Sequence, residues 1–241
     1  MVDLSKINKS NMGKLIDHCV LPKTSAEADI RQGSREAVKY NCAAFYSSSP
    51  FWTPVILEEL KGSDVLPATG IDFPFGASPS KLRALETEMA IEMGNRALDI
   101  VMNIGALKDK RYDIILQDLK QFKNIAGNDI LTKVILEVCY LTDEQIVEGC
   151  KLIAEAGCDY AKTSTGQFEG PSMEQFLLMK ETLKDTDVKL KVSGVKFPRP
   201  QNAYTFILAG ADLIGTRAAV PIIEALDQMR KIGLVPPYTG D

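Results

Sequence analysis

The chain has 241 residues, of which 45% are hydrophobic and 25% charged, the proportions of an ordinary soluble globular protein. Its formal net charge of -4 argues against general nucleic-acid binding, because nucleic-acid-binding faces are basic. No stretch resembles a signal peptide and no apolar run is long enough to cross a bilayer. We therefore expect a cytoplasmic protein with neither nucleic acid nor membrane as a partner.

Two residue types narrow the possible chemistry. The five cysteines include no Cys-x-x-Cys pair, so we expect them to be reduced and mostly buried. His18 is the only histidine, which argues against a histidine-built metal site and against a Ser-His-Asp triad. We expect His18 to be a hydrogen-bonded residue at a strand end, and we expect no metal and no cofactor. Acid–base chemistry then has to come from Asp, Glu, Lys, Tyr or bound water.

Short apolar segments alternate with amphipathic segments along the whole chain. The expected strands lie at residues 15–18, 42–46, 65–71, 97–102, 132–138, 159–162, 188–192 and 213–215. The expected helices lie at residues 26–40, 50–60, 78–93, 112–126, 142–156, 172–183, 201–209 and 220–229. Strands that alternate with helices indicate a parallel sheet covered by helices.

The third helix has clear sequence signals. Ser78 is its expected N-cap and Pro79 its first helical residue. The apolar spacing predicts a buried face made by Leu82, Leu85, Met89 and Met93. Two later helices open with capping-box patterns, formed by Thr142 with Gln145 and by Ser172 with Gln175.

Eight strand–helix repeats in a chain of this length predict an α/β fold, a (β/α)8 TIM barrel. We expect one domain over residues 1–241, with a short helical lead-in and a C-terminal tail from about residue 232. The alternative is a doubly wound open sheet, which usually carries a glycine-rich fingerprint after its first strand. The sequence has no such fingerprint there, so the barrel is favoured.

Charged residues interrupt several of the apolar strands. They are Asp99, Lys133, Glu137, Lys162 and Lys191. One interpretation is a structural ion-pair network, and the other is a catalytic cluster at the C-terminal ends of the strands. In the second interpretation one lysine is a free amine that attacks a carbonyl, because a neighbouring ammonium lowers its pKa. A carboxylate with bound water then moves protons around the iminium.

Several of these segments together resemble the deoxyribose-phosphate aldolases. They are Ile16-Asp17-His18, Phe73-Pro74-Phe75-Gly76-Ala77, Asp99 with Asn103-Ile104-Gly105-Ala106-Leu107-Lys108, Glu137, Lys162-Thr163-Ser164-Thr165-Gly166, and Lys191 with Ser193-Gly194. The resemblance runs from about Ile16 to Glu224. It implies a homo-oligomeric class I aldolase with a (β/α)8 fold, which splits a small sugar or sugar phosphate into acetaldehyde and an aldehyde such as glyceraldehyde 3-phosphate.

The same resemblance implies roles for individual residues. Lys162 would form the Schiff base, Lys191 would tune it electrostatically, and Asp99 would transfer protons together with water. Asp17 and Thr165 would orient substrate hydroxyls or the proton relay. Gly194 and Gly215 lie in the two segments that would hold the substrate phosphate.

The chain departs from the family pattern in those two segments, at Cys19, which replaces a threonine, and at Ser47-Ser48-Ser49-Pro50, which replaces a more apolar segment with a cysteine. Val195 follows Gly194 where the family has a second glycine, and Arg217-Ala218 replaces a pair of serines. Arg217, with Lys196 or Arg199, is therefore our candidate for the anionic end of the substrate. The substrate is then either the family's own or a carboxylated, otherwise phosphorylated or unphosphorylated sugar.

Two functions of other classes stay open at this point. One is a catalytically silent sugar-binding barrel, and the other is a metal-dependent aldolase or isomerase, which the single histidine disfavours. Tyr238, near the C-terminus, is a further candidate for the site.

Overall fold

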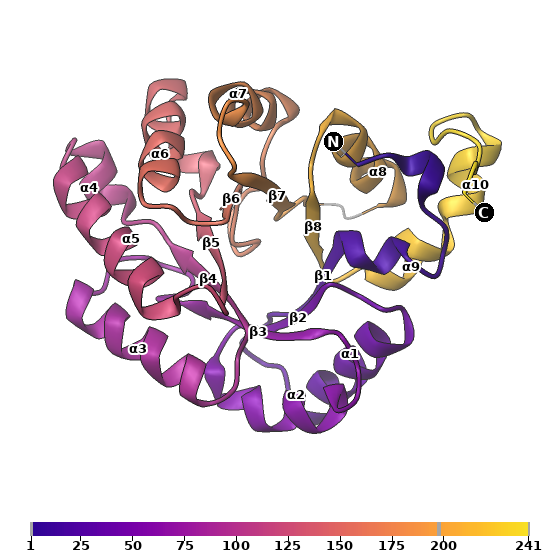
Figure 1. Cartoon of the computed structure of the whole chain (residues 1–241), viewed down its shortest axis with the longest axis horizontal. Helices are drawn as coiled ribbons and strands as arrows, with labels where there is room; N and C mark the ends of the chain where they lie inside the picture. Colours follow the sequence, from indigo (N-terminus) through magenta and orange to yellow (C-terminus); the bar gives the residue numbers. More distant parts are fainter. Residues whose placement is uncertain (1, 197–198, 241) are drawn as a thin grey trace.

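A closed ring of parallel strands forms the centre of the molecule (Figure 1). The structure, a computed structural model, describes residues 2–196 and 199–240. The strands follow chain order around the ring, and β1 pairs with β8. They are β1 (Ile16–Val20), β2 (Ala44–Ser47), β3 (Leu66–Ile71), β4 (Ala97–Val101), β5 (Leu131–Ile135), β6 (Tyr160–Lys162), β7 (Lys189–Ser193) and β8 (Leu213–Thr216). The predicted (β/α)8 barrel is confirmed, and the open sheet is wrong.

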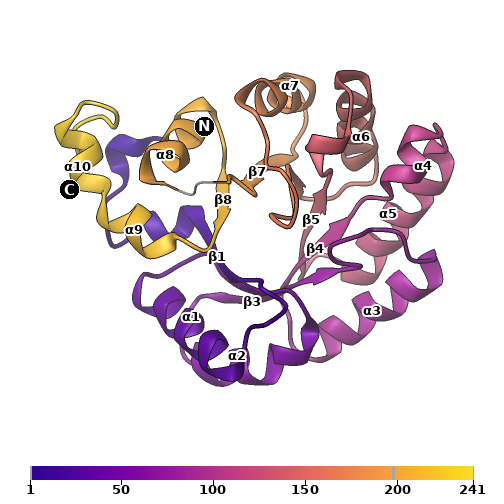
Figure 2. The ribbon, with the colours of Figure 1, turned by 180° about the vertical axis from the view of Figure 1, so that it is seen from behind.

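Helices surround this ring on the outside, as the views from the two sides show (Figures 1 and 2). They are α1 (Glu27–Lys39), α2 (Thr53–Leu60), α3 (Ser80–Glu92), α4 (Ile104–Lys108), α5 (Tyr112–Ala126), α6 (Asp143–Glu155), α7 (Met173–Leu183), α8 (Pro200–Ala209), α9 (Ala219–Glu224) and α10 (Leu226–Lys231). Short 3-10 turns lie at Leu4–Lys6, Met12–Leu15, Pro50–Trp52 and Val138–Tyr140. Within the described residues no helix combines the length and apolar character that a membrane span needs.

Local sequence signals set the start of two helices, α6 and α7. The capping boxes at Thr142 and Ser172 both form, each with the glutamine three residues later. The helix expected over residues 220–229 is instead two short helices, α9 and α10, which meet at Ala225.

Helix α3 buries a different face from the predicted one. Leu82, Leu85 and Met89 are each at least half exposed, at 53%, 50% and 50%, whereas Arg83 is only 3% exposed. The Arg83 guanidinium lies 2.9 Å from Asp118 on α5 and donates a hydrogen bond of 2.5 Å to the Val101 carbonyl. These polar partners on α5 and β4 decide which way the helix turns.

The start of α3 also differs from the prediction. Its N-cap is Pro79, and Ser78 instead donates its backbone N–H and its hydroxyl to the Asp72 carboxylate at 2.8 Å. Ser78 thus closes the loop after β3 and does not cap the helix.

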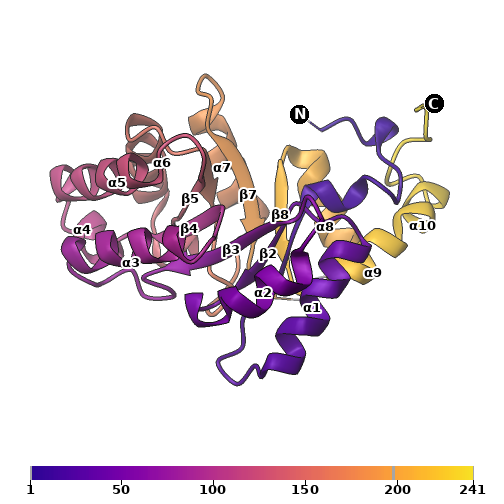
Figure 3. The same cartoon turned by 60° about the horizontal axis from the view of Figure 1, so that its bottom comes forward.

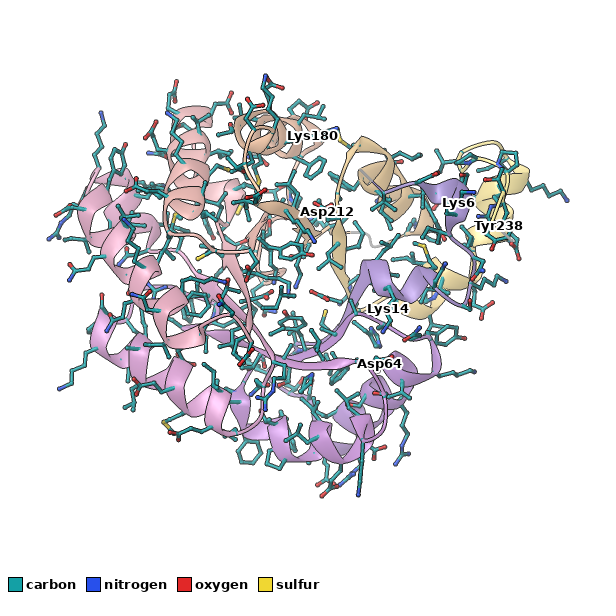
Figure 4. All side chains as sticks on the ribbon, in the orientation of Figure 1. Lys6, Lys14, Asp64, Lys180, Asp212 and Tyr238 are labelled. Carbon is teal, nitrogen blue, oxygen red and sulfur yellow. The ribbon has the colours of Figure 1, made fainter. Side chains whose placement is uncertain are left out.

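The two ends of the chain lie at the same edge of the molecule and pack against each other (Figure 3). The Thr239 N–H donates to the Ser5 carbonyl at 2.8 Å, and Asn8 donates to the Tyr238 hydroxyl at 3.2 Å. Tyr238 lies beside α10 at the edge of the molecule (Figure 4). Tyr238 therefore lies apart from the charged residues inside the barrel, although the sequence made it a candidate for the site.

The Arg83–Asp118 ion pair predicts a stability effect. Arg83→Met should lower the free energy of unfolding by about 3–5 kcal/mol, because it leaves the Asp118 carboxylate unpaired in a site that is 7% exposed. Urea denaturation measures this loss. Arg35→Met is the control. Arg35 pairs with Glu59, but the Arg35 side chain is 67% exposed, so losing this ion pair should lower the free energy of unfolding by less than about 1 kcal/mol. Equal losses in the two variants would contradict the burial argument.

Candidate active site

Alternate residues of the strands point into the barrel, and the register brings their side chains together. Asp99 on β4 lies beside Lys133 on β5, and Lys162 on β6 lies beside Lys191 on β7. On β1, Asp17 lies beside Gly215 of β8. The closed ring therefore holds charges from five strands in one interior volume.

The Asp99 carboxylate joins the two lysines that were predicted to be catalytic. Its Oδ2 atom accepts hydrogen bonds from Lys162 Nζ at 2.7 Å and from Lys191 Nζ at 2.8 Å. Its Oδ1 atom accepts a hydrogen bond from the Tyr46 hydroxyl at 2.7 Å. Asp99 is 1% exposed, so these contacts form out of reach of bulk water.

A second carboxylate, Asp17, distinguishes the two lysines from each other. Its Oδ2 atom lies 2.6 Å from Lys191 Nζ and 3.6 Å from Lys133 Nζ. Lys191 thus has two carboxylate partners, whereas Lys162 pairs with Asp99 alone among the described residues. The Oδ1 atom of Asp17 accepts no hydrogen bond from the described part of the chain, which leaves it available to a ligand hydroxyl.

This asymmetry separates the pKa values of the two amines. Burial lowers the pKa of Lys162, and the nearby charge of Lys191 lowers it further against the opposing effect of Asp99. Burial also acts on Lys191, but Asp17 and Asp99 together raise its pKa above the ordinary value. Lys162 is therefore the amine that loses its proton first. The predicted neighbouring ammonium does lower the pKa of Lys162, but burial is the larger cause.

Burial also opposes ionisation of Asp99, but the ammonium groups of Lys162, Lys191 and Lys133 outweigh it. They hold the pKa of Asp99 below its usual value, so this carboxyl is ionised in the resting site.

A cavity of about 380 Å³ opens above these groups. Nine of the residues that the sequence indicated for the site line it, namely Lys162, Lys191, Asp99, Asp17, Thr165, Gly194, Gly215, Arg217 and Lys196. Lys133, Glu137 and Tyr238 are not among its lining residues in the described structure. Its volume suits a small sugar-like molecule.

The mouth of the cavity is electropositive. Arg217, Lys196 and Arg199 line it with exposed side chains, and none of them forms an ion pair within residues 2–196 and 199–240. Five basic and two acidic side chains line the whole cavity. An anionic group entering from outside therefore meets unpaired cations first.

The two predicted glycines have steric reasons of their own. A Cβ at Gly215 would lie 2.9 Å from Lys191 Cε, so the glycine makes room for that side chain. Gly194 has a φ of +79°, and its Cβ would lie 2.8 Å from Ser164 Cβ.

Glu137 does not join the charge cluster that was predicted from the charged residues of the strands. Strand β5 ends at Ile135, and Glu137 follows with a left-handed φ of 52°. Its buried carboxylate accepts a hydrogen bond from the Thr165 N–H at 3.1 Å, and burial raises the pKa of the Glu137 carboxyl. Asn103 caps α4 by accepting from the Ala106 N–H at 2.9 Å. Glu137 thus supports the loop that carries Thr165.

His18 is a buried, hydrogen-bonded strand residue, as expected. Its Nε2 atom lies 3.1 Å from Glu36, and its Nδ1 atom lies 3.3 Å from the Thr216 carbonyl. Over residues 2–196 and 199–240 no three His, Cys, Asp or Glu side chains come together in a group that could hold a metal ion.

Tyr46 is the site residue that the sequence argument missed. It lines the cavity, and its hydroxyl also accepts a hydrogen bond from Lys133 Nζ at 2.6 Å. Its ring faces the Lys191 ammonium, with 4.1 Å between the nitrogen and the ring centroid. The signal in the sequence was a tyrosine whose neighbours across the sheet are alanines, since Tyr46 pairs with Ala68 and Ala68 with Ala97.

Comparison with known proteins agrees with this geometry. The family model described as DeoC/LacD family aldolase matches residues 12–196. The chain belongs to this aldolase family. The resemblance to deoxyribose-phosphate aldolases is thereby confirmed, and the protein is a carbon–carbon lyase of the aldolase type.

Individual relatives are similar over most of their length. Deoxyribose-phosphate aldolase of Clostridium tetani is 39% identical over 88% of this chain and 97% of that protein. The crystal structure of a putative deoxyribose-phosphate aldolase from Coccidioides immitis has a TM-score of 0.87 and 29% identity, covering 92% of this chain and 88% of that one. A tetrameric deoxyribose phosphate aldolase from Aeropyrum pernix shares the fold, with a TM-score of 0.82 and 24% identity over 92% of this chain and 93% of that one.

The charge of Lys191 predicts a measurable pH effect on Lys162. Methylation of Lys162 by formaldehyde and cyanoborohydride needs the free amine, so its rate should rise with pH through the pKa of Lys162, below the ordinary 10.5. Lys191→Met removes a nearby cation and frees Asp99 to pair with Lys162, and both changes raise that pKa. The midpoint should move up by about one pH unit or more, measured by mass spectrometry of the Lys162 peptide.

Lys189→Met is the matched control. Lys189 lies on β7 like Lys191, but it is the first residue of that strand and its side chain is exposed. An unchanged midpoint in Lys191→Met, or an equal shift in both variants, would contradict the electrostatic role of Lys191.

Proposed function

We propose that this aldolase reversibly cleaves 2-deoxyribose 5-phosphate, or a closely similar sugar phosphate, to acetaldehyde and glyceraldehyde 3-phosphate. The observation that carries the proposal is the shared contact of Lys162 and Lys191 with one oxygen of Asp99, at 2.7 and 2.8 Å. This contact holds the two amines side by side, and Asp17, 2.6 Å from Lys191 Nζ, keeps Lys191 protonated while Lys162 can lose its proton. The relationship to the Clostridium tetani enzyme supports the choice of substrate.

The geometry supports a Schiff-base mechanism with Lys162 as the nucleophile. The neutral amine attacks the C1 aldehyde of the open-chain sugar, and water leaves to form the iminium. A base removes the proton from the C3 hydroxyl, the C2–C3 bond breaks, and its electron pair passes into the iminium to form an enamine. The enamine then takes a proton at C2, and water hydrolyses the product from Lys162. Asp99, through bound water, is the group placed to move these protons.

The remaining predicted residues are assigned to substrate binding. We assign Asp17, whose Oδ1 atom has no hydrogen-bond partner in the described structure, and the buried Thr165 to the hydroxyl groups. We assign Arg217, with Lys196 or Arg199, to the anionic end, because these cations line the cavity. Gly194 and Gly215 keep the backbone beside that end free of side chains.

A second candidate keeps the lysine chemistry and changes the acceptor to one that carries a carboxylate. It is favoured by Arg217 and Val195 at the cavity mouth, since a guanidinium binds carboxylate as well as phosphate. A silent sugar-binding barrel finds no support in the paired lysines, because binding alone does not require them.

The other expectations about the protein's setting are proposals too. The five cysteines are free thiols, which supports a reducing compartment such as the cytoplasm. The tetramer of the Aeropyrum pernix relative supports a homo-oligomer. A small sugar phosphate is the proposed partner, with no nucleic acid, in line with the net charge of -4.

Trapping with borohydride tests the nucleophile directly. After incubation with acetaldehyde and reduction, mass spectrometry should find an ethyl group on Lys162. Lys162→Met should carry no ethyl group and should lose the cleavage activity, because no other amine in the cavity is placed to lose its proton as readily. Lys189→Met should behave as the wild type. An ethyl group on another lysine, or on none, would contradict the assignment.

Removing Arg217 tests the anionic end. Arg217→Ala should raise the KM for 2-deoxyribose 5-phosphate by about 10- to 100-fold, the range expected for losing a charged hydrogen bond. The kcat/KM for unphosphorylated 2-deoxyribose should change by no more than about two-fold, because that sugar has no anion to lose. Arg111→Ala, an exposed arginine outside the cavity, is the control.

Steady-state kinetics with both sugars gives these values. A wild-type enzyme that works better on carboxylate-bearing analogues than on the phosphate would favour the second candidate. An unchanged KM in Arg217→Ala would remove Arg217 from the binding site.

A further inference from the structure

Behind Asp99 lies a chain of hydrogen bonds that the mechanism above does not use. Lys133 Nζ donates to the Tyr46 hydroxyl at 2.6 Å, and the Tyr46 hydroxyl donates to Asp99 Oδ1 at 2.7 Å. Lys133 Nζ lies 3.7 Å from the same oxygen of Asp99, which is too far for a direct hydrogen bond. Tyr46 is therefore the link through which a proton passes between Lys133 and Asp99.

The barrel interior is built around this tyrosine. Tyr46 belongs to one buried cluster with three small side chains, those of Ala44 on its own strand β2, Ala68 on β3 and Ala97 on β4. These alanines leave the space that the ring fills. The ring also faces the ammonium groups of Lys191 and Lys133, at 4.1 and 5.2 Å from its centroid. The hydroxyl is thus held in one place by contacts on both sides.

Lys133 is separated from water. It is 0% exposed and does not line the cavity, whereas Tyr46 and Asp99 do. Its other close charge is Asp17 Oδ2 at 3.6 Å, which also lies beyond hydrogen-bond distance. A proton on Lys133 therefore has one short route toward the cavity, and that route runs through Tyr46 to Asp99.

We propose that Tyr46 and Lys133 form a buried proton relay that serves Asp99. When Asp99 has to act as an acid, Lys133 gives one proton to the Tyr46 oxygen while Tyr46 gives its own proton to Asp99 Oδ1. The relay ends with neutral Lys133, neutral Tyr46 and protonated Asp99. The reverse movement restores the ammonium and the carboxylate. Once Asp99 has given its proton to the substrate, Lys133 stays neutral until Asp99 takes a proton from the substrate or from water and passes it back through Tyr46.

At rest the nearby ammonium groups keep Asp99 ionised, so the relay acts only when Asp99 has to give a proton. Burial lowers the pKa of Lys133, which eases the loss of its proton, and burial raises the pKa of Tyr46 well above normal. Tyr46 therefore passes a proton on without remaining as a tyrosinate. The inference rests on the proposed function, because Asp99 needs a proton donor only if Lys162 forms and releases a Schiff base.

Two measurements on Tyr46→Phe separate a relay from a structural role. The first is the rate at which the enzyme exchanges the methyl protons of acetaldehyde for deuterium in D2O, followed by NMR. The second is the equilibrium fraction of Lys162 that borohydride traps with acetaldehyde. The exchange should slow by about 10- to 100-fold, because proton transfer loses its donor. The trapped fraction should stay within about two-fold, because a relay changes rates and leaves binding equilibria in place.

A matched control and a second variant complete the test. Tyr160→Phe removes another barrel tyrosine, whose ring lies 5.5 Å from Lys133 Nζ and whose hydroxyl does not bond to Asp99 in the described structure. Its exchange rate should match the wild type. Lys133→Met should slow exchange about as much as Tyr46→Phe, and the double variant should be no slower than either, because each change breaks the same relay.

The possible results have distinct meanings. Normal exchange in Tyr46→Phe, or losses that multiply in the double variant, would overturn the relay. If the exchange rate and the trapped fraction of Lys162 fall together, Tyr46 has a purely structural role, and this result would also overturn the relay. If Tyr46→Phe fails to fold, Lys133→Met carries the same comparison. If borohydride trapping with acetaldehyde leaves no ethyl group on Lys162 of the wild-type enzyme, the proposed function itself is contradicted. That failure is separate from a failure of the relay.

Discussion

One buried carboxylate, that of Asp99, holds the interior of this barrel together. Each charge taken out of water costs several kcal/mol, so the lysines inside the ring are tolerable only with partners. Asp99 supplies contacts to Lys162, Lys191 and Tyr46 at 2.7–2.8 Å, from strands β6, β7 and β2. Closure of the sheet is what brings these strands around a single residue of β4. The fold and the chemistry thus depend on the same contacts.

The difference between the two lysines comes from unequal pairing. Lys191 lies between Asp17 and Asp99, at 2.6 and 2.8 Å, and these two carboxylates keep its proton in place. Lys162 has Asp99 as its carboxylate partner and a neighbouring cation, and burial disfavours its charged form. Two amines of the same residue type therefore reach opposite pKa shifts within one cavity. This separation makes an acid–base and nucleophile pair without histidine.

The cavity divides into a buried floor and an exposed mouth. The floor holds paired charges with little freedom, since Asp17, Asp99 and Lys191 are each 1% exposed. The mouth holds exposed cations such as Arg217 and Lys196, which have no ion-pair partners within the described residues. Two of the departures from the family pattern, Val195 and Arg217, line the same cavity. We propose that they alter which acceptor is bound, whereas Lys162, Lys191 and Asp99 are kept on the floor.

Local patterns in the sequence decided the repeat of strands and helices, the capping boxes at Thr142 and Ser172, and the charged residues on strands. These features involve neighbours a few residues apart, so no tertiary contact is needed to read them. Only the folded barrel decided the buried face of α3 and the bond between Tyr46 and Asp99, which are 53 residues apart. It also decided the turn of Glu137 away from the cluster. The physical reason is that a polar side chain turns toward its partner, and here each partner lies on a different strand or helix.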